Sequence, residues 1–146
     1  MWALMHTFAE IADRHDGMAE AKLFFAALRS NLPCRKCREA YDRHTASVKW
    51  GASVVEYARA IHAAVNLDLG KRQYPVIDTT MELRKLHTST LVHVLGKAAR
   101  RSAEFFDACI REREFYSDAE THKALADRLV ISDAVSALKK KADKAA

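Results

Sequence analysis

The chain has 146 residues, 49% of them hydrophobic, with only four Gly and two Pro. This length can bury one core, and the scarcity of helix breakers favours helices with short connections. Lys and Arg outnumber Asp and Glu by 24 to 19, but much of the excess lies in the tail 138–144, so a nucleic-acid partner is not expected. No apolar run approaches the ~20 residues of a membrane span, so no membrane partner is expected, and no secretory signal is evident.

The spacing of apolar residues is helical from the first residues onward. A first helix is expected to end at Asp16 and Gly17, because a turn pair interrupts the apolar stripe there. A second helix is expected to end at Ser30 and Asn31. Pro33 suits the first turn of a third helix, for which Ser30 or Asn31 would be the cap.

The remaining segments also have helical spacing, and none alternates with the period of a strand. A fourth helix is expected from about Ser53 to Gly70. After the connector 71–78, the apolar residues predict one or two long helices through Ile110. Shorter helices are expected around 118–130 and 132–142.

These elements predict an all-α fold. Residues 1–78 are expected to form a four-helix bundle. Residues 79–146 are expected to form a C-terminal helical extension that packs on the same domain.

Cys34 and Cys37 form a C-x-x-C pair directly after Pro33. A lone pair of this kind is compatible with a redox centre, a zinc site or a structural staple. Three cations flank the two thiols: Arg35, Lys36 and Arg38. A helix N-terminus and nearby cations lower the pKa of a thiol, and the thiolate is the reactive form. These features favour a redox pair.

The alternatives for the cysteines lack further partners in the sequence. His44 extends the pair to C-x2-C-x6-H, but no second His or Cys follows at the spacing of a zinc site, so no metal is expected. A thioredoxin-like module needs strands around its C-x-x-C. Cys109 lies on an apolar stripe, which predicts a buried structural thiol, with an intersubunit disulfide or a shuttle cysteine as the alternative.

A second motif, HAAVNLDLGK, occupies residues 62–71. His62 and Asn66 are four residues apart and therefore project from one helical face, with Val65 beside them. Taken alone, this polar pair on an apolar stripe favours a hydrogen bond within the core.

Three motifs together resemble the Erv/ALR family of FAD-dependent sulfhydryl oxidases. They are W-A-L-M-H at 2–6, P-C-x-x-C at 33–37 and H-x-x-V-N-x-x-L-G-K at 62–71. The likeness covers residues 1–75. Ala63 departs from the family pattern, which has Asn at this position. The compact format without a shuttle pair is similar to that of enzymes from large DNA viruses.

The resemblance implies a four-helix bundle that holds FAD at its mouth, usually in a homodimer. Cys37 would lie against the flavin, and Cys34 would exchange with incoming dithiols. The other implied cofactor contacts are Trp2, His6, Tyr41, His62, Val65, Asn66 and Lys71. Proximity alone suggests three more: Tyr57, Arg72 and Tyr74.

The activity implied by the resemblance is disulfide formation in protein substrates. Electrons would pass from a protein dithiol through the C-x-x-C pair to FAD and then to O2, giving H2O2. The compartment would be the host cytoplasm or virion for a viral protein, and otherwise the mitochondrial intermembrane space. The alternative is a helical binding or scaffold module with a basic surface, in which the C-x-x-C is a staple or a zinc site.

Overall fold

The computed structural model describes residues 1–32, 35–68, 70, 80–112 and 116–145. All regular elements in these ranges are helical, and no strand occurs among them, so the expected all-α fold is confirmed. The elements are α1 (Trp2–Arg14), α2 (Met18–Leu28), η1 (Arg29–Asn31), α3 (Arg35–Ser47), α4 (Val54–Asp68), α6 (Thr88–Glu112) and α7 (Asp118–Ala145). Residues 80–84 add a short helical stretch. None of the helices in the described part of the chain is long and apolar enough to cross a membrane.

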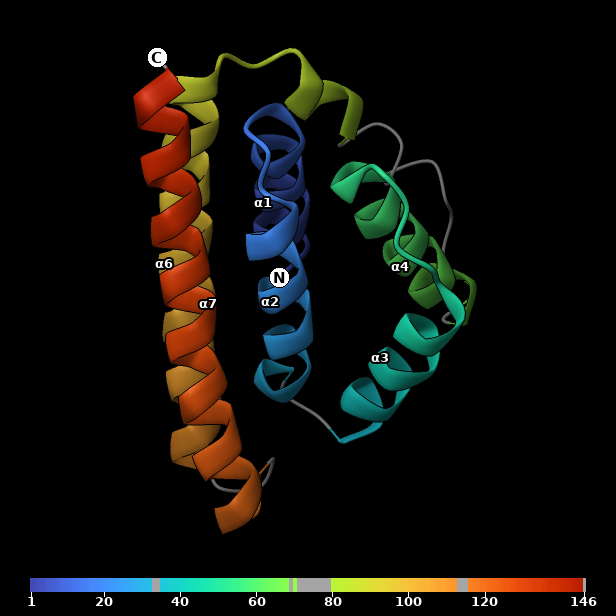
Figure 1. The fold of residues 1–146 in the computed structure, drawn as a ribbon. Coiled ribbons are helices and arrows are strands. Elements are labelled where there is room, and N and C mark those ends of the chain that lie inside the picture. Colours follow the sequence, from blue (N-terminus) through green and yellow to red (C-terminus); the bar gives the residue numbers. More distant parts are fainter. Residues whose placement is uncertain (33–34, 69, 71–79, 113–115, 146) are drawn as a thin grey trace.

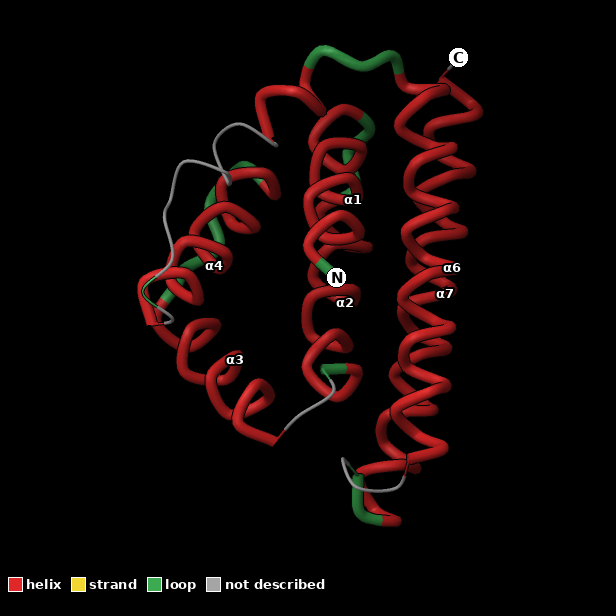
Figure 2. The backbone as a smooth tube through the Cα atoms, turned by 180° about the vertical axis from the view of Figure 1, so that it is seen from behind, coloured by secondary structure: helices red, strands yellow, loops and turns green. Residues whose placement is uncertain are grey.

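The helices are arranged in three layers (Figure 1). The long helices α6 and α7 form an antiparallel pair on one side, α1 and α2 lie in the middle, and α3 and α4 cover the other side. Figure 2 shows the same order from behind, with the N-terminus at the middle layer. The C-terminal helices therefore pack directly on the first two helices of the chain.

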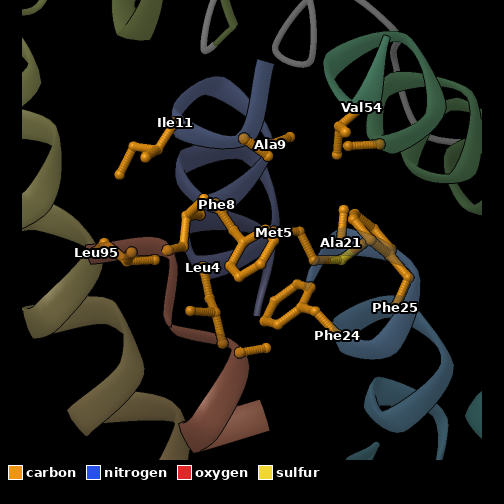
Figure 3. Packing of buried hydrophobic residues seen from close by; sticks show 14 of the residues in the cluster. Leu4, Met5, Phe8, Ala9, Ile11, Ala21, Phe24, Phe25, Val54 and Leu95 are labelled. Carbon is orange, nitrogen blue, oxygen red and sulfur yellow. The ribbon is translucent and has the colours of Figure 1, made fainter. Parts of the chain in front are cut away.

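The middle layer is buried on both faces. Residues 4–12 of α1 are all buried, including polar side chains, because α2, α4 and α6 surround this helix. At the centre, the rings of Phe8 and Phe24 stack with centroids 4.0 Å apart (Figure 3). Val54 of α4 and Leu95 of α6 reach the same cluster from opposite sides. Residues before and after position 78 thus share one core.

Gly17 lies where α1, α2 and α7 come closest together. A Cβ atom at this position would lie 2.7 Å from Leu138 Cδ1 and 2.9 Å from the Cα of Ala12. The neighbouring Asp16 has a φ of 52°, which reverses the chain between α1 and α2. The turn predicted at Asp16 and Gly17 is confirmed, and the glycine is required mainly by the close approach of the Ala12 backbone.

The expectation of two short C-terminal helices is wrong. Instead of separate helices at 118–130 and 132–142, α7 continues through Ile131 without interruption. Neither Gly nor Pro occurs at this point, and Ile131 packs against the core. The buried face continues beyond it through Ala134, Val135 and Leu138, so nothing ends the helix.

The expected cap of the third helix is also corrected. Ser30 and Asn31 lie in η1 and bond to α7 rather than to α3. The hydroxyl of Ser30 donates to Asp127 Oδ2 at 2.6 Å, and Asn31 Nδ2 donates to the carbonyl of Ala124 at 3.1 Å. Both side chains are buried, and these bonds attach the end of α2 to the C-terminal helix.

Candidate functional site

The start of α4 is held by a carboxylate from α1. Asp13 Oδ1 accepts from the backbone N–H of Val54 at 2.7 Å, and Oδ2 accepts from the N–H of Val55 at 3.1 Å. The hydroxyl of Ser53 donates to the same carboxylate at 2.7 Å. An anion at a helix N-terminus satisfies the free N–H groups and interacts favourably with the helix dipole. Asp13 therefore fixes α4 against α1.

This attachment brings His62 to the level of His6. The two helices pack side by side, and His62 lies eight residues beyond Val54, which is about 12 Å at 1.5 Å per residue. His6 lies seven residues before Asp13, about 11 Å in the opposite chain direction. The similar lengths place the two imidazoles opposite each other.

Trp2, His6 and His62 form a ring cluster between α1 and α4. The indole of Trp2 stacks on His62 with centroids 3.7 Å apart and planes 11° apart. Nε2 of His6 lies 2.7 Å from Nδ1 of His62, so the two nitrogens share one hydrogen bond. Three of the residues expected to contact a cofactor are thus brought together across 56 positions of the sequence.

His6 is held neutral within this cluster. Burial, followed by the neighbouring charges of His62 and Arg59, lowers its pKa from 6.5 to about 4. Its Nδ1 is buried and has no hydrogen-bond partner in the described part of the chain. Arg59, one turn before His62 on α4, was not predicted from the sequence; its Nε donates to Thr80 Oγ1 at 3.0 Å.

The other residues expected from the second motif have different environments. Asn66 is buried at 5% exposure, one turn after His62. Val65 is half-buried on the same helix. Lys71 lies outside the described residues, as do Arg72 and Tyr74.

Tyr41 is part of the core between α2 and α3. Its side chain is buried, and its hydroxyl donates to the carbonyl of Phe25 at 2.6 Å. Burial raises its pKa far above the usual value. Tyr57 is likewise buried and stacks on Trp50 with centroids 3.5 Å apart. Both tyrosines contact core side chains, and neither belongs to the ring cluster.

Cys37 lies in the first turn of α3, as expected. It is exposed and disulfide-bonded, whereas Cys109 is a free thiol. Cys34 and Pro33 lie outside the described residues. Arg35 and Lys36 are exposed beside Cys37, so the disulfide stands at a cationic helix start that solvent can reach.

Cys109 is buried, as predicted, in a small cluster with Phe106, Tyr116 and Ala124. Burial raises the pKa of its thiol, and the nearby Glu112 acts in the same direction. Such a thiol is poorly reactive. Elsewhere in the described ranges, no three His, Cys, Asp or Glu side chains meet as a metal site would require.

A cavity of about 750 Å³ lies between α6, α7 and the start of α1. Its floor is apolar and includes Leu4, Ala98 and Val135. Four cations without an ion-pair partner in the described part of the chain line it: Lys97, Arg100, Arg101 and Lys139. The sequence placed much of the cationic excess in the tail 138–144, which contributes Lys139 to this lining, but it did not indicate the cluster formed with α6.

Comparison of the chain with protein-family models, with curated proteins and with solved structures gives no match. The functional inference therefore rests on the residues themselves. They supply two features: a ring cluster in which His6 Nδ1 is buried without a hydrogen-bond partner in the described residues, and an exposed, disulfide-bonded Cys37 at a cationic helix start.

Proposed function

We propose that this protein is an FAD-dependent thiol oxidase of the Erv/ALR type that forms disulfides in protein substrates. The observation that carries the proposal is the meeting of Trp2, His6 and His62, which come from two separate motifs of the resemblance. An exposed disulfide at Cys37 accompanies it, on a helix that packs against α4. We further propose that α1 to α4 hold the cofactor at one end, in a homodimer.

The ring cluster fits the adenine part of a dinucleotide. Flat aromatic and imidazole rings provide stacking surfaces for a base. The unpartnered Nδ1 of His6 and the buried amide of Asn66 are polar groups of the kind that read its edge. Arg59 adds a cation on the same side of α4, where the phosphates of a dinucleotide need one.

The disulfide performs the exchange with substrate. A substrate thiolate attacks one sulfur of the Cys34–Cys37 bond, the other sulfur leaves as a thiolate, and the second substrate thiol then completes the substrate disulfide. The pair gains two electrons and the substrate loses two. Arg35 and Lys36 stabilise the departing thiolate by their charge. FAD, when bound, would take these electrons and transfer them to O2.

The direct experiment is flavin analysis of the purified full-length protein. We expect a yellow protein with close to one FAD per chain, which consumes O2 when dithiothreitol is added. A correctly folded, colourless protein that takes up no FAD during reconstitution would refute the proposal.

Replacing His62 by alanine should weaken FAD binding by at least about tenfold, because the stacking face and the contact with His6 are both lost. Titration of the apoprotein with FAD, followed by flavin fluorescence, measures the change. His93→Ala is the matched control, since His93 is exposed on α6. If the His62 variant and the parent bound FAD with equal affinity, the ring cluster would not be part of the cofactor site.

The cationic cavity favours a second candidate function, a helical module that binds an acidic protein segment. Its apolar floor and its four cations, which have no ion-pair partner among the described residues, suit a ligand that carries both carboxylates and apolar groups. A binding module of this kind does not need a reactive disulfide or a flavin. Flavin analysis of the purified protein therefore distinguishes the second candidate function from the oxidase.

Binding of a fluorescent Glu-rich peptide tests this second candidate. Joint replacement of the four cavity cations by glutamine should weaken binding by about tenfold or more. The matched control replaces four exposed lysines outside the cavity: Lys49, Lys123, Lys140 and Lys144. Similar losses in both variants would indicate general charge attraction and would rule out the cavity as the site.

A further inference from the structure

The start of the C-terminal helix holds the backbone that leads into the C-x-x-C pair. The carbonyl of Leu32, directly before Pro33, accepts two hydrogen bonds. The hydroxyl of Tyr116 donates to it at 2.8 Å, and Arg38 Nη1 donates to it at 2.8 Å. One donor precedes α7 and the other belongs to α3, so this carbonyl joins the extension to the helix that carries Cys37.

Arg38 is a buried cation whose charge is balanced by α7. Its side chain is 3% exposed, and Nη2 lies 2.7 Å from Glu120 Oε2. The guanidinium also lies 4.5 Å from the ring centroid of Tyr116. A buried charge is costly unless it is paired and hydrogen-bonded. Glu120 supplies a charge partner for Arg38, and Tyr116 adds a contact with its ring.

Glu120 is itself fixed in its charged form. It forms a capping box with Ser117, in which the Ser117 N–H donates to Glu120 Oε1 at 3.2 Å and the Glu120 N–H donates to Ser117 Oγ at 3.2 Å. Hydrogen bonds from Ser117, together with the hydrogen bond and charge of Arg38, lower the pKa of Glu120 to about 2. The carboxylate beside Arg38 is therefore a permanent negative charge.

Glu120 of α7 is therefore paired with the cation that directly follows Cys37 in α3. Arg38 is the residue directly after Cys37, and with the α3 N-terminus it favours the thiolate form of the reduced pair. The anion of Glu120 offsets one of these positive charges. The more a site stabilises the thiolate, the more strongly oxidising its disulfide is.

We propose that Glu120 and Tyr116 are positioning residues that set the reduction potential of the Cys34–Cys37 pair through Arg38. This inference rests on the proposed function only in that the pair is redox-active, because the effect does not depend on the electron acceptor. It assigns a role to the C-terminal extension, for which the family resemblance implies none.

Glu120→Gln should make the disulfide more oxidising. Loss of the anion removes a negative charge from Arg38, the residue next to Cys37, and so stabilises the reduced, thiolate-bearing state. We expect the equilibrium constant with the glutathione couple to shift about tenfold toward the reduced pair, which corresponds to about 30 mV. Arg38→Gln should shift it in the opposite direction, and Glu120→Gln should have little further effect in that background.

The measurement equilibrates the full-length protein, as purified, with mixtures of reduced and oxidised glutathione. Free thiols are then trapped by alkylation, and mass spectrometry counts them in the peptide that contains the pair. Asp118→Asn is the matched control, since Asp118 is an exposed carboxylate in the same turn of α7, in which Glu120 is the residue paired with Arg38. Circular dichroism verifies that each variant is folded.

Glu120→Asp covers the case in which Glu120→Gln does not fold. It keeps the charge, so its constant should lie within about threefold of the parent. An unchanged constant in Glu120→Gln, or an equal shift in Asp118→Asn, would overturn the inference. A parent protein without flavin would refute the proposed oxidase and leave this measurement intact, because glutathione supplies the electrons.

Discussion

Cys37→Ser should abolish oxygen consumption with dithiothreitol, with a loss on the order of 10³-fold or more that reaches the background rate. Cys37 is disulfide-bonded in the first turn of α3, and serine cannot form this bond. Without the disulfide, no sulfur accepts the attack of the substrate thiolate. An oxygen electrode measures the rate, and the flavin absorbance verifies that cofactor is still bound.

Cys109→Ser is the matched control for this result. Cys109 is free and buried with Phe106 and Tyr116, so its thiol takes no part in exchange with substrate. We expect the Cys109 variant, where folded, to retain the parent rate within about twofold. If Cys37→Ser retained the parent rate, or if Cys109→Ser abolished it, the roles assigned to the cysteines would be wrong.

Local signals in the sequence were sufficient to predict the helical class and most helix ends. The turn residues Asp16 and Gly17 predicted the end of α1, and the expected starts near Ser53 and near 118 agree with the observed starts of α4 and α7. The predicted end of a helix near Ile131 was wrong, and no Gly or Pro occurs there that would end one. There the length of the helix is decided by burial against α2, which the sequence pattern does not reveal.

The candidate site was predictable in part because its residues lie in recognisable motifs. Trp2, His6 and His62 were expected together and do meet. Asp13, which fixes α4 against α1 and so places His62 opposite His6, was not predicted. A residue of one helix that caps another helix has no fixed sequence spacing from it. Arg59 was missed for a similar reason, since only the fold brings it near His6.

The contacts of the extension were beyond sequence reasoning. Arg38 and Glu120 are 82 residues apart, and each alone is compatible with an ordinary surface charge. The S-x-x-E box at Ser117 and Glu120 signals the start of a helix, in agreement with the expected start of α7. It carries no information on which helix the carboxylate faces. Only the packing of α7 against η1 reveals the partner.

Lowering the pH from 7 to 5 should destabilise the fold by about 2 kcal/mol through His6 alone. His6 is 1% exposed, and burial, with His62 and Arg59, lowers its pKa from 6.5 to about 4. In the unfolded chain the imidazole titrates near 6.5. Between these values the unfolded state binds a proton that the folded state excludes. Its contribution is therefore complete above pH 6.5 and is lost as the pH falls toward 4.

Urea unfolding of the parent and of His6→Gln at pH 7 and pH 5 measures this contribution. The variant lacks the imidazole, so its stability should fall less between the two pH values, by about 2 kcal/mol. Glu120 does not affect the comparison. Its pKa is lowered from 4.5 to about 2, so its contribution to stability is lost only as the pH falls between these two values. His87→Gln, an exposed histidine, should keep the pH dependence of the parent. If His6→Gln kept it as well, His6 would not be the buried neutral group on which the ring cluster depends.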